Sequence, residues 1–149
     1  MGDGASDRLA DPADPDGVQP LLQHTLGRGE PWRVVVTSML LCRTRGDVAE
    51  PIIAEVFRRW PSPRRLSNCR VGVLERLITP LGFQRVRAAR LRAAARFFEF
   101  NPRPPPGELA RVDGVGKYVL DAYRLVVLSD LSVRPEDHAL ARWRREVTR

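Results

Sequence analysis

The spacing of apolar residues most constrains the fold, because these residues recur every three to four positions and do not alternate with polar ones. From about Val18, segments rich in alanine, leucine, valine and arginine follow one another between prolines and glycines. Such a period places apolar side chains on one face of a helix, whereas a half-buried strand needs a period of two. The sequence therefore predicts an all-α fold, with helices over residues 18–27, 32–42, 47–59, 63–67, 71–79, 84–100, 107–111, 117–128 and 136–147.

Three segments indicate how these helices pack. Residues 33–41, RVVVTSMLL, are apolar nearly all round, which predicts a buried central helix. Residues 101–107, NPRPPPG, predict a stiff connector because proline breaks a helix interior. In segment 84–100 the arginines, Arg87 and Arg92 among them, are expected to face solvent. The core stripe predicted there is Val86, Ala89, Ala93, Phe97 and Phe100.

Length and composition indicate one domain. The 149 residues are enough for one hydrophobic core, and residues 1–17 are mostly Asp, Gly, Ala and Pro. We expect a flexible acidic tail over 1–17 and a single domain over 18–149. No stretch reaches the roughly 18 consecutive apolar residues of a membrane span, and the first residues lack a signal-peptide core. The expected location is therefore the cell interior: cytoplasm and nucleoid, or the nucleus in a eukaryote.

The charge of the chain favours a polyanionic partner. Residues 31–149 carry 23 basic and 12 acidic side chains, whereas residues 1–30 are net acidic. A balance of this kind is typical of nucleic-acid-binding proteins. Two cysteines, Cys42 and Cys69, are too few for a disulfide framework, a four-cysteine zinc site or an iron–sulfur cluster held by four thiolates. Packing alone must therefore stabilise the fold.

A glycine-rich turn carries the most specific local signal. Gly114, Val115, Gly116 and Lys117 precede an apolar helical stretch, which is the pattern of a helix-hairpin-helix turn. The glycines allow backbone angles that other residues avoid and clear space for a ligand, so that N–H groups at the helix start can meet a phosphate. Such a turn binds a nucleic-acid backbone without reading bases. The alternative is an ordinary connection between two core helices.

A second signal is an aspartate at a helix start. Pro135 favours a helix that begins just after it, which places Asp137 in the first turn with its carboxylate near the amino end. Taken by itself, an aspartate in this position is most often a helix cap. Arg142 follows five residues later.

Together these blocks resemble the helix-hairpin-helix DNA glycosylase superfamily over about residues 30–149. Within it, the glycosylase domain of methyl-CpG-binding thymine glycosylases is most similar. The resembling residues are 31–33 (PWR), 41–44 (LCRT), 80–82 (PLG), 114–118 (GVGKY), 121–124 (DAYR) and 135–138 (PEDH). The resemblance implies a two-lobed α-helical fold with a DNA-binding cleft, and removal of a base flipped out of the duplex. The cysteines that hold an iron–sulfur cluster in many members are absent after Asp137, so no cluster is expected.

The resemblance also assigns catalytic roles. Asp137 matches the catalytic aspartate of the superfamily, whose carboxylate stabilises the positive charge that develops on the sugar. Tyr118 occupies the position at which bifunctional members carry the lysine that attacks the sugar. Tyr118 is expected to line the base pocket, where related thymine glycosylases also have a tyrosine. A phenol cannot form a Schiff base, so the resemblance implies a monofunctional enzyme. Lys117 lies one residue too early for that attack and is expected to support phosphate binding.

Two further residues are expected to enter the duplex. Arg43 matches the residue that these enzymes insert toward the orphaned base, where a guanidinium can bond guanine acceptors. Phe83 matches an intercalating wedge. The alternatives are a surface ion pair for Arg43 and a core position for Phe83.

The function predicted from the resemblance is a monofunctional DNA glycosylase that removes thymine or uracil mispaired with guanine. The expected partner is double-stranded DNA with a mismatched or damaged base, and the protein is expected to be a monomer. We expect that no cofactor is required. The ion that could bind is a monovalent cation at the hairpin. The alternatives are a non-catalytic helix-hairpin-helix DNA-binding module, or a glycosylase for adenine or an oxidised pyrimidine.

Overall fold

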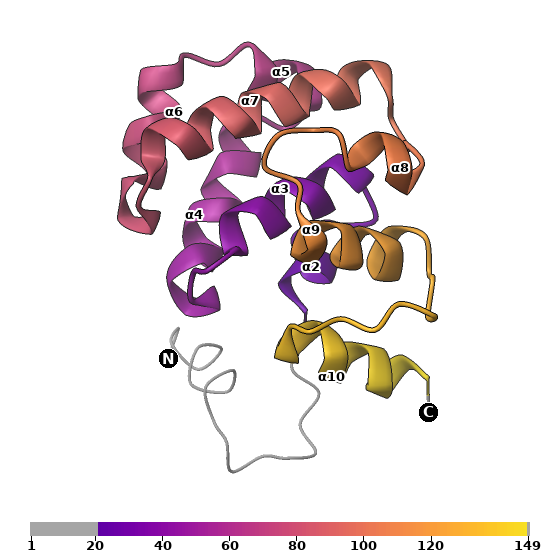
Figure 1. Ribbon diagram of the computed structural model, residues 1–149. Helices are drawn as coiled ribbons and strands as arrows, with labels where there is room; N and C mark the ends of the chain where they lie inside the picture. The colour runs from indigo at the N-terminus through magenta and orange to yellow at the C-terminus, as the bar shows by residue number, and fades with distance from the viewer. Residues whose placement is uncertain (1–20, 149) are drawn as a thin grey trace.

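The computed structural model describes residues 21–148, which form helices and contain no strand (Figure 1). The elements are α2 (Leu22–Thr25), α3 (Pro31–Leu41), α4 (Gly46–Arg59), α5 (Pro63–Ser67), α6 (Val71–Ile78), the 3-10 turn η1 (Thr79–Leu81), α7 (Gln84–Phe100), α8 (Pro106–Leu109), α9 (Lys117–Ala122), the π-helical turn η2 (Tyr123–Val127) and α10 (His138–Val147). The predicted all-α fold is confirmed. The predicted tail, 1–17, and the start of the first predicted helix lie outside the described residues.

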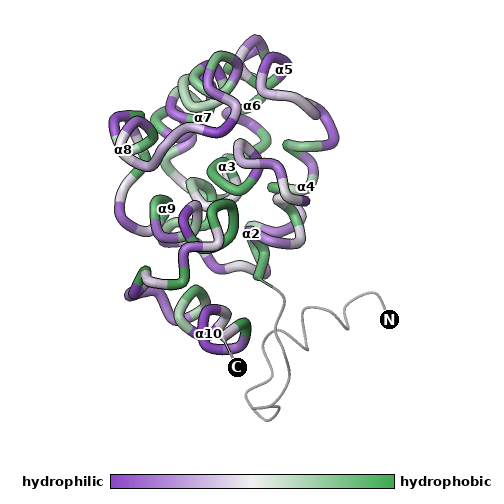
Figure 2. Tube along the Cα trace, turned by 90° about the vertical axis from the view of Figure 1, so that its right-hand side faces the viewer, coloured by the Kyte–Doolittle hydropathy of each residue, from purple (hydrophilic) through white to green (hydrophobic). Residues whose placement is uncertain are grey.

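Helix α3 lies between two groups of helices (Figure 1). It packs against α4 and α7 on one side and against α2, α9 and η2 on the other. Val34, Val35, Val36 and Leu40 are fully buried, and Figure 2 shows α3 as a hydrophobic segment in the middle of the bundle. The predicted buried central helix is confirmed. Helix α3 therefore connects the two groups of helices.

The core consists of two hydrophobic clusters. The larger joins α3 to α4–α7 and to three residues of the hairpin region, Leu109, Val115 and Val119. The smaller cluster joins α10 to η2 and to the start of the described chain. Its buried members are Leu21, Ala122, Leu125, Val133 and Leu140. Leu140 is the buried residue that α10 contributes, so α10 is attached through a much smaller apolar contact than α3 is.

The predicted core stripe of α7 is wrong. Of its five residues, Val86, Ala89, Ala93 and Phe100 are exposed, and Phe97 is half-buried. The helix instead buries Ala88, Leu91, Ala94, Ala95 and Phe98. Both sets recur at helical spacing, because alanines occur all round this helix. Contacts with α3, α5 and α6 decide which set is buried, and these contacts are not visible in the period alone.

Two α7 arginines also depart from the predicted solvated face. Arg87 and Arg92 are half-buried, and their guanidinium groups donate hydrogen bonds to backbone carbonyls of neighbouring segments. Arg92 bonds the Ser67 carbonyl at 3.2 Å, at the end of α5. A long side chain can bury its stem and still satisfy its donors in this way.

The helices around the hairpin differ in detail from the predicted bounds. Helix α8 begins at Pro106, because proline is tolerated in a first helical turn, so the connector is shorter than predicted. The predicted helix over 117–128 is α-helical to Ala122 and then forms η2, in which the Leu128 N–H donates to the Tyr123 carbonyl. Tyr123 is fully buried, and its hydroxyl donates to the Pro104 carbonyl at 2.7 Å. This bond ties η2 to the connector.

Within residues 21–148, every helix is too short or too polar to cross a bilayer.

Candidate active site

The glycine hairpin between α8 and α9 is a tight turn that packs against α3 and α7. Gly114 has a φ of 91°, in the left-handed region that favours glycine. A Cβ at this position would lie 2.9 Å from Cδ of Arg90 and 3.0 Å from Cε of Met39, closer than side chains normally approach. The backbone conformation therefore favours glycine at 114, and a side chain there would also have to displace the flexible Arg90 and Met39 side chains.

Val115 and Gly116 have different surroundings. The Val115 side chain is buried, and its N–H donates to the Val112 carbonyl at 3.1 Å. Val115 thus shapes the turn, and its side chain is turned away from the surface that was predicted to meet DNA. Gly116 is the N-cap of α9, which has no side-chain cap bond, and a Cβ at Gly116 would meet no atom within 4 Å. The amino end of α9 is therefore open to a ligand.

Lys117 is an exposed side chain at the start of α9. Its Nζ donates to the Asp121 carboxylate at 2.6 Å, and Asp121 is buried. The hydrogen bond to Asp121 raises the pKa of Lys117, so the ammonium stays charged. The predicted phosphate contact stays a prediction, and the ion pair with Asp121 offsets part of the positive charge that would serve it.

Asp137 is the N-cap of α10, one residue before the helix and not in its first turn as predicted, so the helix-cap alternative is the one observed. Its backbone is extended, with φ −68° and ψ 134°, and its Oδ2 accepts a hydrogen bond from the Leu140 N–H at 3.0 Å. The first-turn placement is therefore wrong, because the capping bond requires an extended residue ahead of the helix. This bond orients the half-buried carboxylate and engages one of its two oxygens.

Tyr118, on α9, lies close to Asp137. Burial and the negative charge of Asp137 raise the pKa of Tyr118 to about 12, although a hydrogen bond from Gln23 opposes the rise. Gln23 Nε2 donates to the Tyr118 hydroxyl at 2.7 Å. The phenol is therefore neutral at physiological pH, bonded to the Gln23 amide and within electrostatic range of the Asp137 carboxylate. We call Gln23, Tyr118 and Asp137 the Tyr118 cluster.

Gln23 was not predicted as a site residue. It is 1% exposed although it is polar, and it lies on the short helix α2, far from α9 in sequence. The signal that could have identified it is a glutamine inside an apolar helical segment. A buried amide needs a hydrogen-bond partner, which here is Tyr118.

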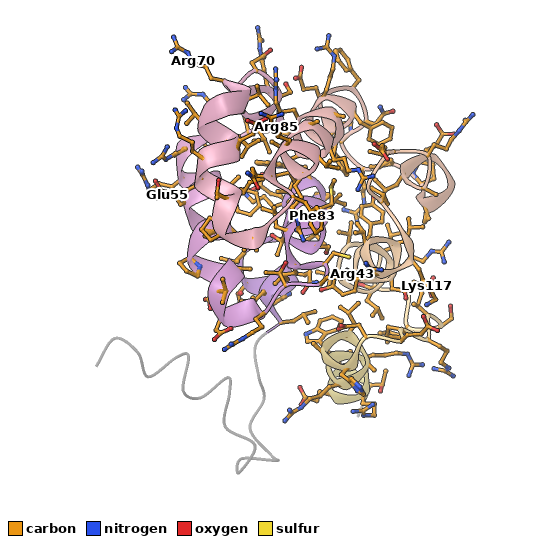
Figure 3. All side chains as sticks on the ribbon, turned by 60° about the vertical axis from the view of Figure 1, so that its left-hand side comes forward. Arg43, Glu55, Arg70, Phe83, Arg85 and Lys117 are labelled. Atoms are coloured by element: carbon orange, nitrogen blue, oxygen red, sulfur yellow. The ribbon has the colours of Figure 1, made fainter. Side chains whose placement is uncertain are left out.

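Arg43 and Phe83 both lie on exposed turns with left-handed backbone. Arg43, between α3 and α4, has a φ of 59°, and Phe83, ahead of α7, has a φ of 51°. Phe83 is 80% exposed, which excludes the core alternative. Arg43 forms no ion pair with a carboxylate of residues 21–148, which removes the support for the ion-pair alternative. In the view of Figure 3, Phe83, Arg43 and Lys117 follow one another across the molecule.

A cavity of about 390 Å³ lies beneath these two turns and reaches the hairpin. Arg43, Phe83 and Gly114 all line it. The rest of its wall is apolar except for two arginines of α7. These lining residues are Met39, Leu40, Cys42, Leu81, Val86, Arg87, Arg90 and Leu91. The cavity therefore brings together three segments predicted to contact DNA.

Five of the predicted residues thus fall into two groups, whereas Val115, Gly116 and Lys117 line a separate hollow beside the start of α9. Arg43, Phe83 and Gly114 share the cavity, whereas Tyr118 and Asp137 belong to the Tyr118 cluster and do not line it. Helix α9 connects the groups, because it begins directly after the hairpin and carries Tyr118 in its first turn.

Among residues 21–148, no group of three or more His, Cys, Asp or Glu side chains is arranged to hold a metal ion. The monovalent cation predicted at the hairpin stays a prediction.

A helical fold in which a glycine hairpin joins two helices, ahead of a helix capped by an aspartate, is typical of a helix-hairpin-helix protein. The model of the family described as HhH-GPD superfamily base excision DNA repair protein matches residues 36–145. This match covers most of the chain, so the chain belongs to the HhH-GPD superfamily of base excision DNA repair proteins. The resemblance seen in the sequence is confirmed.

Curated relatives include two archaeal proteins and one plant protein. The chain is 36% identical over 94 residues to the thymine/uracil-DNA glycosylase of Pyrobaculum aerophilum, covering 60% of this chain and 41% of that protein. It is 32% identical over 94 residues to the thymine-DNA glycosylase of Aeropyrum pernix, covering 60% and 42%. It is 30% identical over 113 residues to the methyl-CpG-binding domain protein 4-like protein of Arabidopsis thaliana, covering 74% and 24%. The chain thus spans less than half the length of each relative.

Replacing Gly114 tests whether the hairpin conformation is required. Gly114→Ala should lower the free energy of unfolding by about 1–3 kcal/mol, because alanine is strained at positive φ and its Cβ would collide with Arg90 and Met39. Urea unfolding followed by circular dichroism measures the change. Gly107→Ala is the matched control, because a Cβ there meets no atom within 4 Å. Equal effects of the two substitutions would contradict the packing role of Gly114.

Titration of Tyr118 tests its contact with Asp137. The chain has two tyrosines, so the Tyr123→Phe background isolates the Tyr118 signal. Phenolate absorbance at pH 11 should show Tyr118 mostly protonated, because its pKa is about 12. Asp137→Asn removes a negative charge and should lower this pKa, giving more phenolate at pH 11. An unchanged titration in Asp137→Asn would show that the two groups are not in electrostatic contact.

Proposed function

We propose that the protein is a monofunctional DNA glycosylase that removes thymine or uracil from mispairs with guanine. Family membership supports a role in base excision repair, and the names of the archaeal relatives support a pyrimidine as the excised base. The observation that carries the proposal is the Asp137 carboxylate, which the cap of α10 orients and which lies within electrostatic range of Tyr118 on the helix that follows the hairpin. A carboxylate close to bound DNA repels phosphates, so its presence favours a chemical role.

Base flipping is the step assigned to the two exposed turns. A base inside a duplex cannot reach a protein carboxylate, so it must be turned out of the stack. Phe83 supplies an exposed apolar side chain that can enter the stack, and Arg43 supplies a guanidinium that can bond the acceptors of a guanine left without its partner. The open amino end of α9 then binds the backbone of the flipped strand.

The Tyr118 cluster offers the groups that a flipped pyrimidine requires. The Tyr118 oxygen accepts a bond from Gln23, and its proton remains to donate to a base carbonyl. Its pKa of about 12 keeps the phenol protonated at physiological pH. The half-buried Tyr118 hydroxyl, held by the buried Gln23, can therefore donate to the polar edge of thymine or uracil.

Asp137 acts on the sugar. When the N-glycosidic bond breaks, its electron pair leaves with the base and positive charge develops on the deoxyribose. The carboxylate stabilises that charge and accepts a proton from a water molecule whose oxygen bonds to C1′. The departing base takes up a proton, so the products are the free base and an abasic site on an intact strand.

Asp137→Asn separates chemistry from folding and binding. Asparagine is as good an N-cap as aspartate, so α10 should keep its cap and the protein its stability. Base release under single-turnover conditions should fall by at least about a hundredfold, whereas DNA binding should be retained. The matched control is Asp130→Asn, which removes the same charge from a loop carboxylate bonded to Ser132. Unchanged base release in Asp137→Asn, with or without an effect in the control, would refute the proposed chemistry.

The monofunctional mechanism is tested by borohydride trapping. Lys117 is the one lysine of the chain, so it is the one side-chain amine able to form an imine with the sugar. Its Nζ is bonded to Asp121, and no covalent DNA adduct should be trapped during base release. A trapped adduct that disappears in Lys117→Ala would replace the water mechanism by an amine mechanism. Release from T:G, U:G, A:G and oxidised pyrimidine:G duplexes ranks the bases in the same assay.

A further inference from the structure

Both turns that carry the duplex-entering side chains have an unusual backbone. Arg43 and Phe83 are non-glycine residues in the left-handed region. Such residues are uncommon and persist where surrounding contacts hold them. Contacts that hold the Arg43 turn therefore determine where the Arg43 guanidinium lies before DNA binds.

Arg87 makes those contacts. Its Nη1 donates to the carbonyls of Met39 and Leu40, each at 3.2 Å, in the last turn of α3. Its Nη2 donates to the Cys42 carbonyl at 3.0 Å and to the Thr44 hydroxyl at 3.3 Å. The last two acceptors lie immediately before and after Arg43. All four hydrogens of the two terminal nitrogens are thus directed at the segment that carries Arg43.

The charge of Arg87 is also directed at this turn. Arg87 forms no ion pair with a carboxylate in the described part of the chain. Burial lowers its pKa. Carbonyl groups at the carboxyl end of a helix carry partial negative charge, which an arginine can balance. The α3 carboxyl end provides that balance here. Moving Arg87 would remove its bonds to the Met39 and Leu40 carbonyls, whereas the Cys42 carbonyl would keep its bond from the Thr44 hydroxyl.

The same residue connects the turn to the Phe83 wedge. The Arg87 N–H donates to the Phe83 carbonyl at 2.9 Å, which is the first backbone bond of α7. One residue thus bonds the Arg43 turn through its side chain and the Phe83 turn through its backbone. Both turns are thus bonded to one residue, which lines the cavity together with Arg43 and Phe83.

We propose that Arg87 is a positioning residue that fixes the Arg43 turn and thereby sets how strictly the protein distinguishes the base opposite the excised one. Arg87 acts through Arg43, because its terminal donors are bonded to the protein itself. The proposal rests on the proposed function in one respect, the contact of Arg43 with the orphaned base.

Hydrogen exchange of the full chain without DNA tests the first half of the proposal. Arg87→Met keeps an unbranched side chain and removes the donors. The amides of Cys42 and Thr44, which donate to Ser38 and Leu41, should exchange at least about tenfold faster. The matched control is Arg92→Met, which removes an α7 arginine that bonds the Ser67 carbonyl away from this turn. Unchanged exchange in Arg87→Met, or equal acceleration in the control, would overturn the proposal.

Opposite-base selectivity tests the second half. The readout is the ratio of single-turnover rates for uracil release opposite guanine and opposite adenine, measured below the melting temperature of every variant. Arg87→Met should lower this ratio about tenfold, to a value close to the ratio of Arg43→Ala. In the double variant, Arg87→Met should add nothing to Arg43→Ala, because both remove the same interaction. Arg87→Lys, which can reach some of the four acceptors, should restore part of the ratio.

The outcomes separate this proposal from the proposed function. Normal base release with an unaltered ratio in Arg87→Met would overturn the positioning role and leave the glycosylase proposal intact. Additive effects in the double variant would also overturn it, because a purely structural loss does not depend on Arg43. A wild-type protein that releases no base from any duplex would refute the proposed function, and the selectivity role of Arg87 would fail with it.

Discussion

The close contact of the Gly114 hairpin with α3 and α7 is the constraint on which the rest of the structure depends. A residue without a side chain at 114 lets the turn approach Arg90 and Met39, and α9 begins directly after it. That approach sets the position of α9, and with it the position of Tyr118. It also closes one end of the cavity beneath Arg43 and Phe83. The packing of this one turn thus positions the start of α9, proposed to bind the DNA backbone, relative to the Arg43 and Phe83 turns and to the Tyr118 cluster.

Electrostatics at the Tyr118 cluster follow from the ends of two helices. Asp137 lies at the amino end of α10, where a negative charge is favoured by the helix dipole and by the Leu140 N–H. Tyr118 is partly buried next to it, so its phenol is kept neutral. The result is one fixed anion beside one neutral donor. A catalyst of N-glycosidic bond cleavage needs this pairing, because positive charge develops on the sugar while the base requires hydrogen bonds.

The sequence predicted most of the fold, and the failures have physical causes. Helix existence followed from apolar spacing and from proline and glycine positions, and α3 was recognisable because its residues are apolar all round. The core face of α7 was not recognisable, because alanines lie on several faces of this helix and contacts with neighbouring helices determine which face is buried. Of the site, Pro135 placed Asp137 at the start of a helix, although as its N-cap and not in its first turn. The contacts of Gln23 and Arg87 could not be predicted, because their hydrogen-bond partners are distant in sequence.

The uneven attachment of α10 has a consequence for heat inactivation. The helix contributes Leu140 to a small apolar cluster, whereas α3 is buried along most of its length. A segment with few apolar contacts opens at a lower free energy than the domain as a whole. Because Asp137 caps this segment, local fraying of α10 would displace the proposed catalytic carboxylate while the remaining helices stay folded. Under the proposed function, thermal loss of base release would then precede the main calorimetric transition, and cooling would restore it.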